Sequence, residues 1–120
     1  QMCIRDRERI QFGKPIAALQ GLQWYISDMA TKIECAKWMV FRAAWLKVDG
    51  QPYTKEAAIA KLNASETANF VVNKALQIHG GYGYLKDYPL ERMYRDAKIT
   101  EIYEGTSEVH KLVISRSVLK

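Results

Sequence analysis

The feature that most constrains this chain is a run of apolar residues at three- and four-residue steps between Ile16 and Val48. The residues that form the pattern are Ile16, Leu19, Leu22, Ile26, Met29, Ile33, Ala36, Val40, Ala43 and Ala44. This is the period of an amphipathic helix, and Pro15 is tolerated in its first turn. At about 1.5 Å per residue such a helix is about 50 Å long. Because one helix cannot bury its own apolar stripe, further helices must pack against it.

A second helix is predicted from Thr54, as N-cap, to about His79. Its apolar face is rich in alanine, which lets a neighbouring helix approach closely, and the short connection Asp49–Pro52 makes the two helices antiparallel. Two shorter helices are expected after it, from Pro89 to about Lys98 and from Thr106 or Ser107 through Arg116. No segment has the alternating pattern of a strand. The sequence therefore predicts an all-α fold.

The composition is that of one small globular domain, with 120 residues of which 48% are hydrophobic and 26% charged. The net charge is +5, but Lys and Arg alternate with acidic residues, which disfavours a nucleic-acid-binding stripe. Cys3 and Cys35 have neither CxxC spacing nor a nearby His pair, so we expect no metal site, no disulfide and a reducing compartment. No apolar run reaches the ~18 residues of a membrane span, so none is expected.

The first residues differ in character from the rest. Met2–Asp6 resembles the conceptual translation of a sequencing-library adapter more than a natural helix end. We therefore expect residues 1–7 to be a non-native or truncated segment and residues 8–120 to form the domain. With the natural N-terminus missing, no targeting segment can be identified, so a bacterial cytoplasm is the default expectation and a mitochondrial matrix the alternative for a eukaryotic source.

Three segments have a structural explanation beside a functional one. Arg9–Gly13 suits either a helix-entry loop or a pyrophosphate site, because it joins an arginine to a glycine bend before a helix start. Gln77–Gly81 ends the second helix, where paired glycines serve as a C-cap or allow close approach of a ligand. His79 within it fits a packed helix-end residue better than a catalyst. Arg95 and Asp96 are expected to form ion pairs that tie their helix to its neighbours.

The segment Ile102–Glu108 is the most informative. Glu104 lies on an irregular stretch before Gly105 and a predicted helix N-terminus. Apolar neighbours that desolvate a carboxylate raise its pKa, as a general base requires, and we expect such neighbours here. Thr106, Ser107 and the backbone donors that follow suit an anion or a ribitol hydroxyl. The same stretch also fits a capped helix start with a solvated Glu.

Four motifs together resemble those of the acyl-CoA dehydrogenase family, in the family's order and approximate spacing: Arg-x-Gln-Phe-Gly, Gln-x-x-Gly-Gly, Arg-Asp-Ala-Lys and Ile-Tyr-Glu-Gly-Thr. The resemblance covers essentially Glu8 to Lys120. It implies the family's C-terminal domain, an up-and-down four-helix bundle, without the N-terminal helical and middle β domains. Isovaleryl- and long-chain-type members supply their base from a different helix, so Glu104 implies the short- or medium-chain type.

The resemblance also implies the site of an FAD-dependent enzyme of fatty acid β-oxidation. Glu104 is the implied base, which removes a proton next to the thioester carbonyl while hydride passes to the flavin, giving a trans-2-enoyl-CoA. Tyr103 and Gly105 are implied to contact the acyl-CoA. The residues implied to bind FAD are Arg9, Gln11, Phe12, Gln20, Gln77, Gly80, Gly81, Thr106, Ser107 and Glu108. No metal is implied.

Partners follow from the same resemblance. The first two motifs reach the FAD of a neighbouring subunit in the family, so a homotetramer built as a dimer of dimers is implied, with electron-transfer flavoprotein as electron acceptor. The alternatives are an acyl-CoA oxidase on the same scaffold and a non-catalytic helical binding module. Without the two upstream domains, the isolated fragment is expected to be inactive and prone to associate, because apolar faces remain uncovered.

Overall fold

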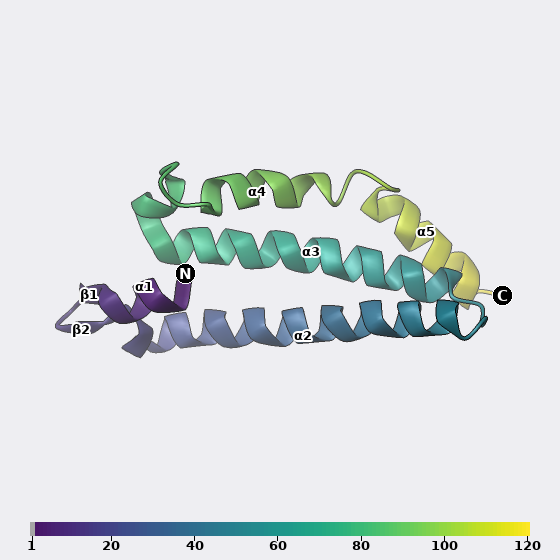
Figure 1. Cartoon of the computed structure of the whole chain (residues 1–120), viewed down its shortest axis with the longest axis horizontal. Coiled ribbons are helices and arrows are strands. Elements are labelled where there is room, and N and C mark those ends of the chain that lie inside the picture. The colour runs from purple at the N-terminus through teal and green to yellow at the C-terminus, as the bar shows by residue number, and fades with distance from the viewer. Residues whose placement is uncertain (1) are drawn as a thin grey trace.

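The computed structural model describes residues 2–120, and the side chains of residues 5–120, as an array of long helices (Figure 1). The helices are α1 (Met2–Glu8), α2 (Gln20–Val48), α3 (Thr54–His79), α4 (Leu90–Ile99) and α5 (Ser107–Val118). Short elements connect them: strands β1 (Ile10–Gln11) and β2 (Lys14–Pro15), and the 3₁₀ turns η1 (Ile16–Ala18) and η2 (Gly80–Tyr84). The all-α prediction, with four principal helices, is confirmed.

Helix α3 is the centre of the array. It packs along α2 on one side, while α4 and then α5 follow one another along its other side (Figure 1). The chain therefore runs up through α2, down through α3 and up again through α4 and α5. The resulting bundle is elongated, with principal extents of 57 × 25 × 24 Å. Because α3 contacts all the other long helices, it is the framework against which each loop is positioned.

The core is narrow and lies mainly between α2 and α3. Its buried cluster is Ile16, Met29 and Ile78, with partly buried Leu19, Leu22, Ile26, Phe70 and Val71 packed against it. Farther along the helices the buried positions are small residues such as Ala36, Ala43 and Ala58. Small side chains let two helix axes come close, as the alanine-rich pattern predicted, but they bury little apolar area each.

Two predicted helix starts and the expectation of no strands differ from the structure. Helix α2 begins at Gln20, four residues after the predicted start, because Leu19 has extended backbone angles (φ −82°, ψ 120°) after the turn η1. Thr54 is the first helical residue of α3; Tyr53 is the N-cap and no side chain caps the helix. The expectation of no strands is also wrong, because the two short strands β1 and β2 pair antiparallel. Positive φ angles at Phe12 (54°) and Gly13 (75°) turn this hairpin.

The start of α5 is as predicted. Thr106 is the N-cap, and its hydroxyl accepts a hydrogen bond from the backbone N–H of Val109. This bond satisfies one of the donors that a helix N-terminus leaves free. The helix start is thereby fixed immediately after Gly105.

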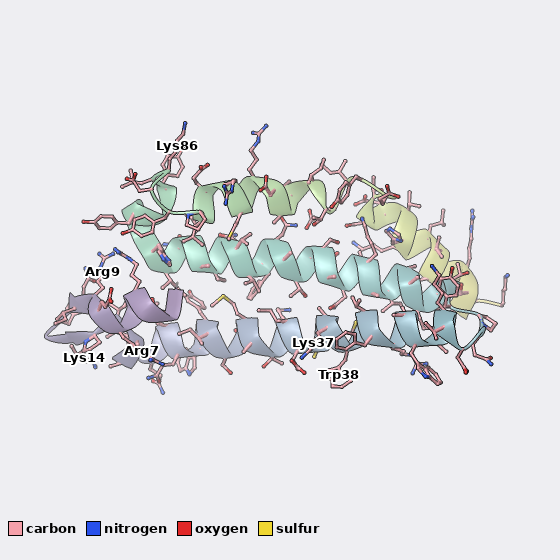
Figure 2. The ribbon with its side chains drawn as sticks, in the orientation of Figure 1. Arg7, Arg9, Lys14, Lys37, Trp38 and Lys86 are labelled. Carbon is pink, nitrogen blue, oxygen red and sulfur yellow. The ribbon has the colours of Figure 1, made fainter. Side chains whose placement is uncertain are left out.

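The outer face of α2 carries large apolar side chains that are exposed. Trp24, Trp38 and Trp45, at steps that are multiples of seven, are each 62% exposed. Figure 2 shows Trp38 pointing outward from α2, on the side away from α3. No described helix is long and apolar enough to cross a membrane. Several large exposed apolar side chains on one helix are typical of a surface that another protein surface covers.

Candidate functional site

The turn between α4 and α5 has an unusual backbone. Glu104 has a φ of +55°, in the left-handed region that non-glycine residues rarely adopt, and Gly105 follows with +92°. The end of α4 leads into it through backbone hydrogen bonds such as that from the Tyr103 N–H to the Ile99 carbonyl. Two consecutive positive φ angles reverse the chain sharply and place Glu104 at the outside of the turn. Strained residues of this kind persist where the surrounding contacts hold them.

Three hydrogen bonds hold this turn. Lys61 Nζ, on α3, donates to the Gly105 carbonyl at 2.7 Å. His110 Nε2, on α5, lies 3.2 Å from the Glu104 carbonyl, which can only accept, so this nitrogen carries the hydrogen. The backbone N–H of Ser107 donates to the Glu101 carbonyl at 3.1 Å. The turn is thus attached to α3, to α5 and to its own first residue.

The His110 ring also explains the glycine at position 105. A Cβ on Gly105 would lie 3.1 Å from His110 Nε2 and 3.5 Å from Cε1. A side chain there would push the ring away, in addition to the strain of the positive φ.

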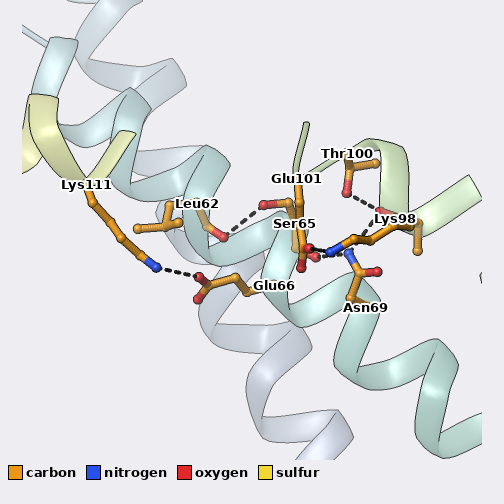
Figure 3. Close-up of polar contacts among 9 residues, drawn as sticks. Leu62, Ser65, Glu66, Asn69, Lys98, Thr100, Glu101 and Lys111 are labelled. Carbon is orange, nitrogen blue, oxygen red and sulfur yellow. Dashed lines mark hydrogen bonds and ion pairs between the residues drawn. The ribbon is translucent and has the colours of Figure 1, made fainter. Parts of the chain in front are cut away.

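Polar contacts between α3, α4 and α5 surround the turn (Figure 3). Asn69 Nδ2 donates to the Ala97 carbonyl at 2.9 Å, which ties α3 to α4. Lys98 pairs with Glu101 on the same helix end, and this hydrogen bond raises the pKa of Lys98. Lys111 and Glu66 form an ion pair at 3.6 Å between α5 and α3.

A hollow of about 250 Å³ opens between these groups, and Thr106, Ser107 and Glu108 contribute to its wall. The Ser107 hydroxyl is buried without a hydrogen-bond partner among the described residues. The pKa of Glu108 is held below its usual value, first by its hydrogen bond to a backbone N–H and then by the Thr106 hydroxyl. The structure therefore brings three of the predicted FAD-binding residues together beside Glu104.

The expected desolvation of Glu104 is not supplied by this chain. The side chain is exposed, and its neighbours Ile102 and Tyr103 are each 52% exposed. The expectation that nearby apolar residues of the chain bury this carboxylate is therefore wrong.

The remaining predicted residues gather at the other end of α3. The guanidinium of Arg9 lies over Gly80, where Nη1 is 3.6 Å from the position a Cβ would take, and Gly81 has open space around it. A hollow of about 480 Å³ is lined by Arg9, Gln11 and Tyr82. Figure 2 shows Arg7, Arg9 and Lys14 at this end of the bundle, which we call the basic end.

Phe12, at the tip of the hairpin, is 88% exposed, and Gln20 and Gln77 are also exposed. These three side chains project from the basic end and are available to a group outside the chain. With Arg9, Gln11 and the two glycines, they complete the set of predicted residues at this end.

The two groups are far apart within one chain. Lys61, which holds the Glu104 turn, and His79, which precedes Gly80, are separated by eighteen helical residues of α3, or about 27 Å. Figure 1 likewise shows the α4–α5 connection and the hairpin toward opposite ends of the bundle. One chain therefore does not bring all the predicted FAD-binding residues together.

Other predicted residues have structural surroundings. His79 is only 1% exposed, with Nδ1 2.9 Å from the Ala75 carbonyl, as expected for a packed helix-end residue. Arg95 and Asp96 form no ion pair within the described part of the chain, so that expectation is wrong; Asn69 makes the corresponding connection. Among residues 2–120, no cluster of three or more His, Cys, Asp or Glu is arranged to hold a metal ion.

Sequence reasoning missed Lys61 and His110. Lys61 lies more than forty positions before Gly105, in the middle of a helix, where a lysine is most often solvated. His110 lies six residues after Glu104, across a helix boundary. Neither residue belongs to a recognisable motif, so no local signal identifies them.

Comparison with known proteins identifies the class. The family described as "Acyl-CoA dehydrogenase, C-terminal domain" matches residues 2–119. This chain belongs to the acyl-CoA dehydrogenase family and corresponds to its C-terminal domain. Acryloyl-CoA reductase (NADH) of Anaerotignum propionicum is 74% identical over 113 residues, which are 94% of this chain and 29% of that protein.

Two further relatives support the same class. The short-chain specific acyl-CoA dehydrogenase of Clostridium acetobutylicum is 58% identical over 95% of this chain and 30% of its own length. The solved structure of butyryl-CoA dehydrogenase from Megasphaera elsdenii has a TM-score of 0.97 and 45% identity, covering 99% of this chain and 31% of that one. The chain spans about a third of the length of the relatives it matches.

Proposed function

We propose that this chain is the C-terminal domain of a longer FAD-dependent oxidoreductase that interconverts a short acyl-CoA and its trans-2-enoyl-CoA, with Glu104 as the acid–base residue. The observation that carries the proposal is the held turn at Glu104. A single carboxylate stands there at the outside of a strained turn, with the N-cap Thr106 and the first turn of α5 beside it. A general base needs this kind of fixed placement.

In the dehydrogenation direction, Glu104 takes the proton from the carbon next to the thioester carbonyl as the adjacent carbon loses hydride. FAD, when bound, supplies the acceptor for that hydride. Tyr103 and Gly105 flank the base and contact the acyl-CoA. Because Glu104 is exposed in this chain, surfaces from the rest of the enzyme must cover it and exclude water.

The residues present fit FAD in two places. Arg9 beside Gly80 and Gly81 provides a guanidinium and open backbone for an anionic pyrophosphate, and Gln11, Phe12, Gln20 and Gln77 project around this end. Thr106, Ser107 and Glu108 provide hydroxyl, backbone and carboxylate groups near the base, including the unpaired Ser107 hydroxyl.

Since about 27 Å separates the two places along α3, we infer that each serves a different FAD and that sites are shared between subunits. The exposed tryptophans of α2 offer a surface for such assembly, and we propose the homotetramer, a dimer of dimers, that the family resemblance implies. We further propose that residues 1–7 are not native and that the domain is residues 8–120.

The physiological direction follows the relatives. The relative with 74% identity is an acryloyl-CoA reductase, and another, at 54%, is the CarC subunit of a caffeyl-CoA reductase-Etf complex of Acetobacterium woodii. We therefore propose electron-transfer flavoprotein as the redox partner, with reduction of a short enoyl-CoA as the second candidate direction. In that direction Glu104 delivers the proton that it removes in the forward reaction.

The test is anaerobic bleaching of the flavin by acyl-CoAs of increasing length, in the full-length enzyme and its Glu104→Gln variant. We expect rapid bleaching by butyryl-CoA in the parent and its loss in the variant, with substrate still bound. If the variant bleaches as fast as the parent, the base lies elsewhere in the enzyme. Oxygen consumption at a rate matching turnover favours an oxidase instead. The isolated 120-residue chain is expected to retain no flavin and to show no turnover.

A further inference from the structure

We propose that Lys61 and His110 are positioning residues that fix the catalytic turn by binding the two carbonyls that bracket Gly105. This inference rests on the proposed role of Glu104 as the acid–base residue. Lys61 donates to the Gly105 carbonyl at 2.7 Å, and His110 Nε2 donates to the Glu104 carbonyl at 3.2 Å. The two residues therefore act on Glu104 through its backbone and not through its carboxylate.

The two hydrogen bonds define the backbone conformation of the turn. The Glu104 carbonyl belongs to the peptide unit before Gly105, and the Gly105 carbonyl to the unit after it. Holding both carbonyls fixes the orientation of both peptide planes, and with them the positive φ of Gly105. Fixing the peptide plane that follows Glu104 also fixes the position of the Glu104 Cα, and so limits the region that its carboxylate can reach.

Lys61 connects the turn to the most constrained element of the fold. It lies on α3, which packs against α2, α4 and α5, and its side chain is half-buried. The ammonium group forms no ion pair within the described residues and binds instead the carbonyl of a residue forty-four positions away. A hydrogen bond from a charged donor is stronger than a neutral one, so this contact is suited to holding a strained turn.

His110 completes the restraint from the other side. Its ring lies against Gly105, so that even a methyl group at that position would come within 3.1 Å of Nε2. Its Nδ1 is buried without a partner, which leaves the Glu104 carbonyl as the ring's hydrogen-bonding contact among the described residues. The ring therefore serves both as a donor and as a wall that keeps position 105 a glycine.

The experiment uses the full-length flavoenzyme with Lys61→Met, which removes the donor, and Lys61→Arg, which keeps one. Lys55→Met is the matched control, because Lys55 lies on the same helix α3 and makes an ion pair with the adjacent Glu56 at 3.4 Å, away from the turn. The first readout is the rate of flavin reduction at saturating butyryl-CoA. The second is the affinity for crotonyl-CoA, and the third is amide hydrogen exchange of residues 100–109.

For Lys61→Met we expect flavin reduction to slow by about 100-fold, the loss typical of a misplaced reacting group. Crotonyl-CoA affinity should change less than threefold, and exchange should accelerate only in residues 100–109. Lys61→Arg should recover part of the rate, and the control should match the parent. Unchanged flavin reduction in Lys61→Met overturns the proposal. So does a loss that is accompanied by faster exchange throughout α3, because that outcome indicates a purely structural lysine.

If Lys61→Met does not fold, the pair His110→Gln and His110→Phe carries the test. Gln keeps an N–H donor and should retain most of the rate, whereas Phe keeps the ring without the donor and should slow flavin reduction. Equal rates in the two variants overturn the proposal. Glu104→Gln, measured in parallel, separates this test from that of the base. If that variant reduces flavin normally the proposed base is wrong, while hydrogen exchange still reports whether Lys61 holds the turn.

Discussion

Replacing Gly83 with alanine is expected to destabilise the domain, although its backbone angles suit any residue. A Cβ at this position would lie 2.9 Å from both the Leu76 carbonyl oxygen and the His79 Cβ. Ordinary contacts of this kind are about 3.5–4.0 Å. Neither neighbour is a flexible side-chain end, so the backbone of η2 must move away from α3. Overpacking of this kind costs about 1–3 kcal/mol.

Gly81→Ala is the matched control, two residues away in the same turn. Its Cβ would meet nothing within 4 Å, and its φ is outside the left-handed region. Losing glycine there restricts the unfolded chain and should stabilise the domain by about 0.4–1 kcal/mol. The two substitutions should therefore differ by about 1.4–4 kcal/mol, the sum of the overpacking and entropy effects.

Urea unfolding followed by far-ultraviolet circular dichroism, at one protein concentration, measures the difference. With a slope of about 2 kcal/mol/M, the midpoint of Gly83→Ala should lie about 1 M below that of Gly81→Ala. Equal midpoints for the two variants contradict the reasoning, because they mean that η2 has room for a side chain at Gly83.

Three further predictions concern other parts of the fold. Asp6→Ala should raise the free energy of unfolding by about 1–3 kcal/mol at neutral pH, because both carboxylate oxygens are buried without a partner. Burial raises the pKa of Asp6 in the folded protein, although the charges of His79 and Arg5 partly oppose this shift. The loss of stability caused by the buried carboxylate is therefore absent below the pKa that Asp6 has in the unfolded chain, and it grows as the pH rises toward the pKa in the folded protein. A gain in urea midpoint that is equally large at about pH 3 contradicts this account. Asn69→Ala should lower the free energy of unfolding by about 1–2 kcal/mol in the same assay, because the Ala97 carbonyl loses the hydrogen bond that Asn69 donates from α3. An unchanged urea midpoint disproves that role. Trp38→Gln should weaken self-association in sedimentation velocity, and an unchanged distribution means that another surface drives it.

The helices were predictable because their signal is local. The three- and four-residue apolar period located α2 and α3, and the start of α5 was placed at Thr106 or Ser107 from their residue types, of which Thr106 is the cap. The start of α2 was predicted wrongly because two local conformations are compatible with the same residues. Pro15 and Ile16 fit a helix start, yet the chain forms a 3₁₀ turn first, because Leu19 takes an extended conformation.

The candidate residues were also identifiable from motifs, but their spatial grouping was not. Arg9, which directly follows α1, comes to lie beside Gly80 because α1 packs against α3. The same packing separates them from Thr106 by most of the length of α3, which no motif indicates. This separation is the basis of our proposal that sites are shared between subunits.

The sequence by itself determined that this chain is a helical domain of the acyl-CoA dehydrogenase type, because periodicity, caps and motif order are properties of neighbouring residues. Only the tertiary structure decided how Glu104 is presented. The carbonyls on either side of Gly105 are bound by Lys61, forty-four positions away, and by His110, on the next helix, and both side chains meet the turn only once α3 and α5 are packed. A hydrogen bond between such residues has no sequence pattern, since it depends on where three helices bring their side chains.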